Sequence, residues 1–146
     1  MANRINNMDY PKVAMHKGVF PPNANGHTYK PAPYHGASTH TTRGGRKTRW
    51  NIPQNGQYYV FNYGDERNWM DVQARGIFSF CNKCKDVIGE NGERLAFFPK
   101  PMNENDPWHG YPVFSDEIED ENLVESWANA GEIDVITKQR LLRQAI

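Results

Sequence analysis

The pattern of hydrophobic and polar positions changes along the chain, and the change divides it into two parts. Up to residue 56, apolar residues occur singly among glycines and prolines, with neither the period of two of a strand nor the 3.6-residue period of a helix. This pattern predicts an extended arm with turns over residues 1–56. Apolar and aromatic runs are denser from residue 57 onward, so we expect a single folded domain over residues 57–146.

Short apolar runs in the middle of the chain predict a small antiparallel sheet. Aromatic and β-branched residues dominate these runs, and turn-forming residues bound each run. We expect strands over residues 57–63 and 77–81, and a loop followed by an edge strand within residues 108–114. Asn91-Gly92 adopts positive φ at little cost and predicts a hairpin turn, with residues 87–88 and 94–98 as its two arms.

The last part of the chain predicts two helices. Leu123, Val124 and Trp127 form the apolar stripe of a helix over residues 121–130. Asp120 is placed to cap its first turn, and Gly131 is placed to end it in the left-handed conformation.

A second helix is expected over residues 137–145, with Thr137 as its N-cap and a hydrophobic staple between Ile136 and Leu141. The two helices would form an αα-hairpin. The offsets resemble those of short C-terminal helical hairpins of bacterial proteins at Leu123, Trp127, Ala130-Gly131-Glu132-Ile133, Thr137 and Leu141-Leu142. This resemblance implies packing or self-association through residues 121–146. The predicted fold class is therefore α+β, a small antiparallel sheet with a C-terminal αα-hairpin and a long irregular basic N-terminal arm.

Charge is segregated along the chain although the net charge of the 146 residues is zero. Residues 1–50 carry eight Lys or Arg and one acid, residues 51–101 carry six of each, and residues 102–146 carry three bases and ten acids. A basic arm suits an anionic partner. The alternative is that the arm folds back on the acidic end of its own chain.

Cys81 and Cys84 form a Cys-x-x-Cys pair that suits a metal better than a structural disulfide. Two thiolates at this spacing can hold one tetrahedral zinc ion, which needs two further ligands. His35 and His40 have a fitting spacing and would tie the arm to the domain, and His109 is another candidate ligand. The alternative is two reduced thiols near a sheet edge. Zinc is the only cofactor that the sequence suggests.

A run of cations from residue 43 to residue 49 is the clearest candidate for binding nucleic acid. Its glycine-rich backbone suits phosphate contacts, and the aromatic residue that follows could stack on a base. The candidate residues are Arg43, Arg46, Lys47, Arg49 and Trp50. The alternative is a solvated basic linker, and binding by such a run would be salt-sensitive and weakly sequence-selective.

His109 lies in an aromatic, proline-flanked loop and is a candidate for acid–base chemistry. Together with His35 and a cation such as Arg46 it would supply the acid, base and phosphate ligand of a metal-independent nuclease. The segments 30–36 and 53–57 resemble the opening segments of bacterial polymorphic-toxin domains, a resemblance that carries over no catalytic role. The alternative is a structural loop in which Trp108 and Tyr111 pack and His109 bonds to backbone.

These patterns leave three hypotheses for function. The first is a small non-enzymatic binding protein of bacterial or phage type whose arm contacts nucleic acid or a large assembly. The second is the nuclease or toxin domain just described, and the third is a structural or adaptor subunit. No stretch approaches the length of a membrane span, and the cysteine usage favours a cytoplasmic setting with no membrane partner.

Overall fold

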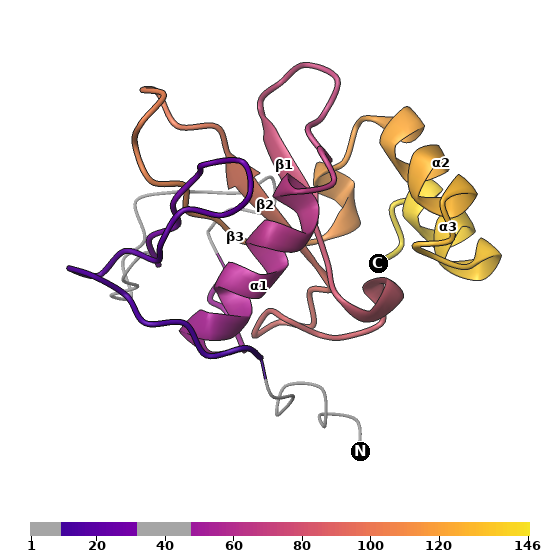
Figure 1. Cartoon of the computed structure of the whole chain (residues 1–146). Coiled ribbons are helices and arrows are strands. Elements are labelled where there is room, and N and C mark those ends of the chain that lie inside the picture. The colour runs from indigo at the N-terminus through magenta and orange to yellow at the C-terminus, as the bar shows by residue number, and fades with distance from the viewer. Residues whose placement is uncertain (1–9, 32–47) are drawn as a thin grey trace.

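A computed structural model describes residues 10–31 and 48–146, and its elements are labelled in Figure 1. The α-helices are α1 (Gln54–Asp65), α2 (Glu121–Asn129) and α3 (Val135–Leu142). The strands are β1 (Gly76–Ser79), β2 (Leu95–Pro99) and β3 (Tyr111–Val113). Short 3-10 turns occur at Asn82–Cys84 and Ser115–Glu117. The α+β class, with an antiparallel sheet and a C-terminal helix pair, is confirmed.

The sheet is small and antiparallel, and β2 is its central strand. The strand order is β1-β2-β3, with Phe78 opposite Phe97 and Ala96 opposite Pro112. All four residues of β1 are buried, because α1 packs against this strand. In Figure 1, α1 crosses in front of the sheet, and α2 and α3 lie together at one side. The edge position predicted for the third strand is confirmed, and it tolerates Pro112, which cannot donate to a strand ladder.

Residues 57–63 belong to α1, so the strand predicted there is wrong. Val60, Phe61 and Gly64 are buried at a spacing that places them on one face of a helix. A Cβ on Gly64 would lie 2.7 Å from the Cβ of Ser79, so glycine allows this close approach to β1. The Ser79 hydroxyl donates to the Val60 carbonyl at 2.6 Å. Burial of this face against the sheet overrides the strand propensity of its aromatic residues.

The tight turn at Asn91-Gly92 is confirmed, but the predicted hairpin is wrong in its first arm. The Ile88 amide donates to the Glu93 carbonyl at 2.8 Å, and Gly92 has a φ of 99°. However, β2 is already paired on both edges, with β1 and β3. The Ile88 carbonyl instead accepts a hydrogen bond from the Asn51 amide at 2.7 Å.

Residues 10–31 contribute to the same core as the rest of the chain. Phe20 and Tyr29 are 1% and 0% exposed, and the Phe20 ring stacks on Tyr58 with centroids 4.4 Å apart. The Phe20 amide donates to the Tyr29 carbonyl at 2.8 Å, which closes this segment into a loop. The predicted division between residues 56 and 57 falls inside α1, with core residues on both sides of it.

The first C-terminal helix begins at the predicted residue and ends one residue earlier than predicted. Asp120 accepts a hydrogen bond from the Leu123 amide at 3.2 Å, which caps α2. Gly131 follows the helix with a φ of 77°. On its buried side, Trp127 meets Trp69 and Phe80 with ring centroids 5.3 and 4.9 Å away. This aromatic contact holds the C-terminal hairpin to the sheet.

The second C-terminal helix begins two residues earlier than predicted, and its cap is Asp134 instead of Thr137. The Asp134 carboxylate accepts a hydrogen bond from the Thr137 amide at 2.8 Å, and a carboxylate is a strong acceptor at a helix N-terminus. The predicted staple is also wrong, because Ile136 is 61% exposed whereas Leu141 is buried. In the parts of the chain that the structure describes, no helix has the length and apolar character needed to cross a membrane.

Candidate functional site

The two cysteines of the Cys-x-x-Cys pair are buried at the ends of a left-handed turn whose middle residues are exposed. Asn82, Lys83 and Cys84 all have positive φ, between 49° and 65°. Burial raises the pKa of the Cys81 and Cys84 thiols to about 12. The Cys81 sulfur lies 3.6 Å from a carboxylate oxygen of Asp86, which disfavours a second negative charge at that position. The surroundings therefore favour the thiol over the thiolate that a metal needs.

Zinc binding stays a prediction, because two of its four proposed ligands, His35 and His40, lie outside the described residues. Within residues 10–31 and 48–146, no group of three or more His, Cys, Asp or Glu side chains could hold a metal ion. The Cys84 sulfur lies 3.8 Å from the Arg94 carbonyl, so both sulfur atoms have neighbours in the protein.

Of the predicted nucleic-acid-binding run, the structure describes two residues. Arg49 is exposed, whereas Trp50 is half-buried. The Trp50 indole donates to the Gly110 carbonyl at 3.1 Å and lies 5.9 Å from the Phe98 ring, so it packs on the protein. Three other members of the run lie outside the described residues, Arg43, Arg46 and Lys47.

His109 is exposed. Residues near the two ends of the undescribed stretch 32–47 form hydrogen bonds with the residues that precede and follow His109 in the sequence. On one side, the Lys30 amide donates to the Trp108 carbonyl at 2.8 Å. On the other side, the Trp50 indole donates a hydrogen bond to the Gly110 carbonyl. The partners predicted for His109 in a nuclease site, His35 and Arg46, lie outside the described residues, so this site stays a prediction.

Acidic residues of the C-terminal region pair with cations from the middle and end of the chain. The pairs are Arg67–Glu132 at 3.6 Å, Arg75–Glu119 at 3.9 Å, Lys85–Asp134 at 2.7 Å and Lys138–Glu125 at 3.0 Å. Lys83, Lys100 and Arg143 are exposed and have no such ion pair in the described residues. Four arm cations are likewise exposed and form no ion pair with an acidic residue in the described parts of the chain. They are Lys12, Lys17, Lys30 and Arg49.

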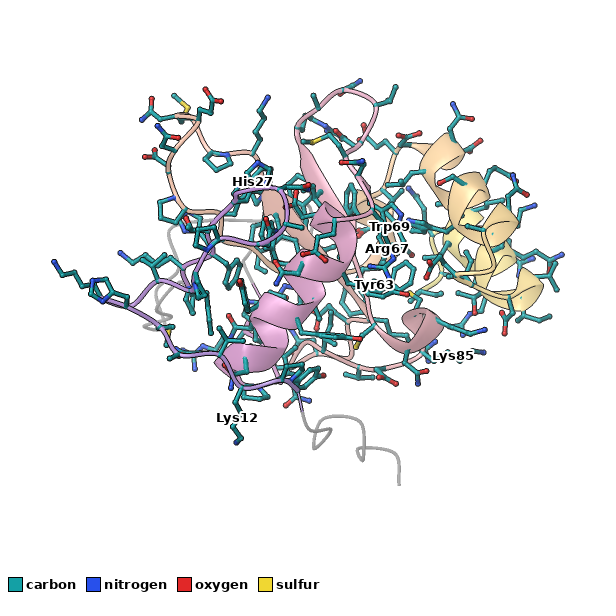
Figure 2. All side chains as sticks on the ribbon, viewed as in Figure 1. Lys12, His27, Tyr63, Arg67, Trp69 and Lys85 are labelled. Carbon is teal, nitrogen blue, oxygen red and sulfur yellow. The ribbon has the colours of Figure 1, made fainter. Side chains whose placement is uncertain are left out.

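A histidine–carboxylate pair that the sequence did not predict lies at the C-terminal end of α1. The His27 Nδ1 atom is 2.9 Å from Oδ2 of Asp65, the last residue of the helix. Asp65 is only 3% exposed, whereas the His27 side chain is 34% exposed. Figure 2 shows His27 at this end of α1 and Lys12 near the other. A buried carboxylate on one ring nitrogen orients the imidazole and leaves Nε2 to act on a ligand.

Asn23 fixes the loop that carries His27. Its side-chain oxygen accepts hydrogen bonds from the Asn25 and His27 amides at 2.9 and 3.0 Å. Its side-chain nitrogen donates to Asp65 Oδ2 at 2.7 Å, which docks the loop on α1. Asn23, from the loop itself, and Asp65, from α1, therefore together position the His27 imidazole.

His27 lines a cavity of about 420 Å³ beside the loop that follows β2. Lys100 and Glu104 line the same cavity and are exposed, so one hollow combines an imidazole, a cation and a carboxylate. The His27 and Trp108 rings are 5.3 Å apart, and Trp108 is 3% exposed. Of these residues, the sequence pattern singled out only Trp108. The others could not be linked to one site, because they lie far apart in the sequence and no local pattern connects them.

The candidate site is thus the cavity that His27, Lys100 and Glu104 line, with Asp65 bonded to the His27 ring. Its members come from the arm, from α1 and from the loop after β2, so only the folded chain assembles them. Searches of protein-family models, of curated proteins and of solved structures found nothing that matches this chain.

Proposed function

We propose that this chain binds single-stranded nucleic acid through the cations of its N-terminal arm. The observation that carries the proposal is that every described Lys or Arg of the arm is exposed and has no acidic partner within the described parts of the chain. Four of the C-terminal acids bond to cations such as Lys85 and Lys138, while Lys12, Lys17, Lys30 and Arg49 have no acidic partner among the described residues. Exposed cations without internal partners can neutralise phosphates, and such binding weakens steeply with salt.

The position of the arm also supports this proposal. Lys30 is bonded through its amide to Trp108, and Arg49 precedes Trp50, which is bonded to Gly110. The two cations therefore lie beside the same short loop. A strand that contacted both cations would pass beside this loop, and such contacts can track a phosphate backbone.

Charge reversal tests the proposal better than truncation, because removing residues 1–50 would take Phe20 and Tyr29 out of the core. We expect the double variant Lys17→Glu/Lys30→Glu to bind a fluorescein-labelled single-stranded RNA more weakly, measured by anisotropy at low salt. It should also lower the slope of log affinity against log salt by about one for each phosphate that the arm no longer neutralises.

The matched control is Lys83→Glu/Arg143→Glu, which changes the net charge equally at two exposed positions outside the arm. If both double variants lose the same affinity, binding depends on net charge alone and the arm has no special role. If the unaltered protein does not bind the strand at low salt, the proposal is wrong. An adaptor that contacts a protein assembly would then be the remaining hypothesis.

A cytoplasmic setting belongs to the same proposal. Cys81 and Cys84 are both buried and are not joined in a disulfide, which suits a reducing compartment. Zinc stays outside the binding mechanism proposed here, since the arm cations need no metal to contact phosphate.

A further inference from the structure

We propose that the cavity beside His27 is an RNA-cleaving site in which His27 is the general acid, Glu104 the general base and Lys100 the phosphate ligand. The inference rests on the proposed function, because the arm would deliver the strand to the cavity. It differs from the site expected from the sequence, which was built on His109 and His35.

The geometry of His27 suits proton transfer. Its Nδ1 atom faces the carboxylate of Asp65 at 2.9 Å, and that carboxylate is buried and also held by Asn23 at 2.7 Å. A carboxylate in this position orients the ring and keeps Nε2 directed to a ligand. Asp65 is a positioning residue, since it lies behind the ring and touches no substrate.

The other two groups come from the loop that begins at the end of β2. Lys100 is fixed at its amide, which donates to the Arg75 carbonyl at 2.9 Å, while its side chain is exposed. Glu104 is also exposed and forms no ion pair with a cation in the described parts of the chain. Within the loop, Asn103 donates to Asp106 at 3.1 Å, which restricts its shape.

The proposed step balances without a metal, water or redox partner. The Glu104 carboxylate takes the proton of a ribose 2′-hydroxyl, and the 2′-oxygen attacks the adjacent phosphorus. The bond from phosphorus to the 5′-oxygen breaks, and His27 Nε2 gives its proton to that oxygen. Lys100 neutralises the charge that develops on the phosphate. The products are a 2′,3′-cyclic phosphate and a 5′-hydroxyl, so RNA is a substrate and DNA is not.

The test uses the full chain in the presence of EDTA with two labelled strands of one sequence, RNA and its 2′-O-methyl analogue. We expect cleavage of the RNA with cyclic phosphate ends, binding of the analogue without cleavage, and a bell-shaped dependence of rate on pH. His27→Ala should lower the rate by roughly a hundredfold or more. Added imidazole should restore part of that rate, which a purely structural role of His27 would not allow.

Two further variants complete the test. His16→Ala removes an exposed histidine of the same arm and should leave the rate unchanged. Glu104→Gln removes the proposed base and should lower the rate by roughly a hundredfold. Folding should be unaffected, because the Glu104 side chain is exposed.

The outcomes separate the two proposals. Binding of the analogue with no cleavage of RNA would overturn this inference and leave nucleic-acid binding intact. No binding of either strand would overturn both. Full cleavage by both His27→Ala and Glu104→Gln would place the activity elsewhere and overturn the assignment of residues.

Discussion

The N-terminal segment 10–31 and the C-terminal hairpin 121–142 both cover the aromatic core, but they are held by different means. The hairpin carries its own caps and stop signals, at Asp120, Gly131 and Asp134. The segment has no helix and contacts the core through inserted rings such as Phe20. The comparison shows that one region is specified mainly by short-range rules, whereas the other depends on a surface built by the rest of the chain.

The largest expected effect comes from removing an inserted ring. Phe20→Ala should lower the free energy of unfolding by about 3–5 kcal/mol, because it leaves a cavity against Tyr58. Residues 10–31 should also become sensitive to limited proteolysis. Met15→Ala, at a position that is 40% exposed in the same segment, should change stability by less than about 0.5 kcal/mol. Similar denaturant midpoints for the two variants would show that the segment contributes little to stability.

Two glycine variants separate tertiary from local constraint. Gly64→Ala should cost about 1–3 kcal/mol, because its new methyl group meets the Ser79 Cβ at 2.7 Å and the Phe78 carbonyl oxygen at 3.0 Å. Gly131→Ala meets no atom within 4 Å and should cost about 1 kcal/mol through its φ of 77° alone. Thermal and urea denaturation would measure both. A stabilised Gly64→Ala variant would mean that α1 does not press closely on β1.

The cap of α2 is the next test of the local rules. Asp120→Ala should lower the free energy of unfolding by about 1–2 kcal/mol, since it removes the acceptor for the Leu123 amide. The Val72 amide, which bonds to the other carboxylate oxygen at 2.8 Å, loses its acceptor too. Asp120→Asn keeps one acceptor and should cost less. An equal loss in Asp120→Ala and in Glu121→Ala, measured by urea denaturation, would argue against capping.

The smallest effect at moderate pH concerns the turn that carries Cys81 and Cys84, which lies between the N-terminal segment and the C-terminal hairpin. Tyr10 lies beside Cys81 on one side of it, and Lys85 bonds to Asp134 on the other. Folding raises the thiol pKa from 9.0 to about 12, so the folded chain keeps protons that the unfolded chain has released. Stability is therefore full below pH 9 and falls as the pH rises from 9 towards 12. At pH 9 the loss should be about 0.4 kcal/mol per thiol.

Cys84→Ala is the control for that pH dependence, because it removes one of the two thiols and should reduce the fall in stability on the alkaline side. Thiol accessibility should be low in the folded protein and complete after unfolding. Stoichiometric zinc in the purified protein, with loss of the alkaline dependence, would contradict protonated thiols and support the metal site.

Local chemistry explains which parts of the fold could be predicted. Asp120 and Gly131 act within a few residues of themselves, so their roles are visible in the sequence. The strand predicted at 57–63 failed because the same aromatic residues suit a strand and a buried helix face, and only packing against β1 decides between them. The cap at Asp134 was missed because Thr137 also has a capping side chain.

The candidate site was less predictable than the fold for a related reason. His109 and the cysteine pair drew attention through neighbours in the sequence, whereas His27 acquires its partner, Asp65, from a residue 38 positions away. The turn around Asn23 could have marked His27 as rigidly held. Nothing near either residue indicates that they meet.

By itself, the sequence determined the class of the fold, the C-terminal helix pair with its first cap and stop, the tight turn at Asn91-Gly92 and the separation of charge along the chain. Those features depend on interactions between near neighbours or on composition. Tertiary structure decided that residues 57–63 are a helix, that residues 10–31 enter the core, and that His27 meets Asp65. These features depend on surfaces that exist only after distant segments pack, where burial outweighs local preference.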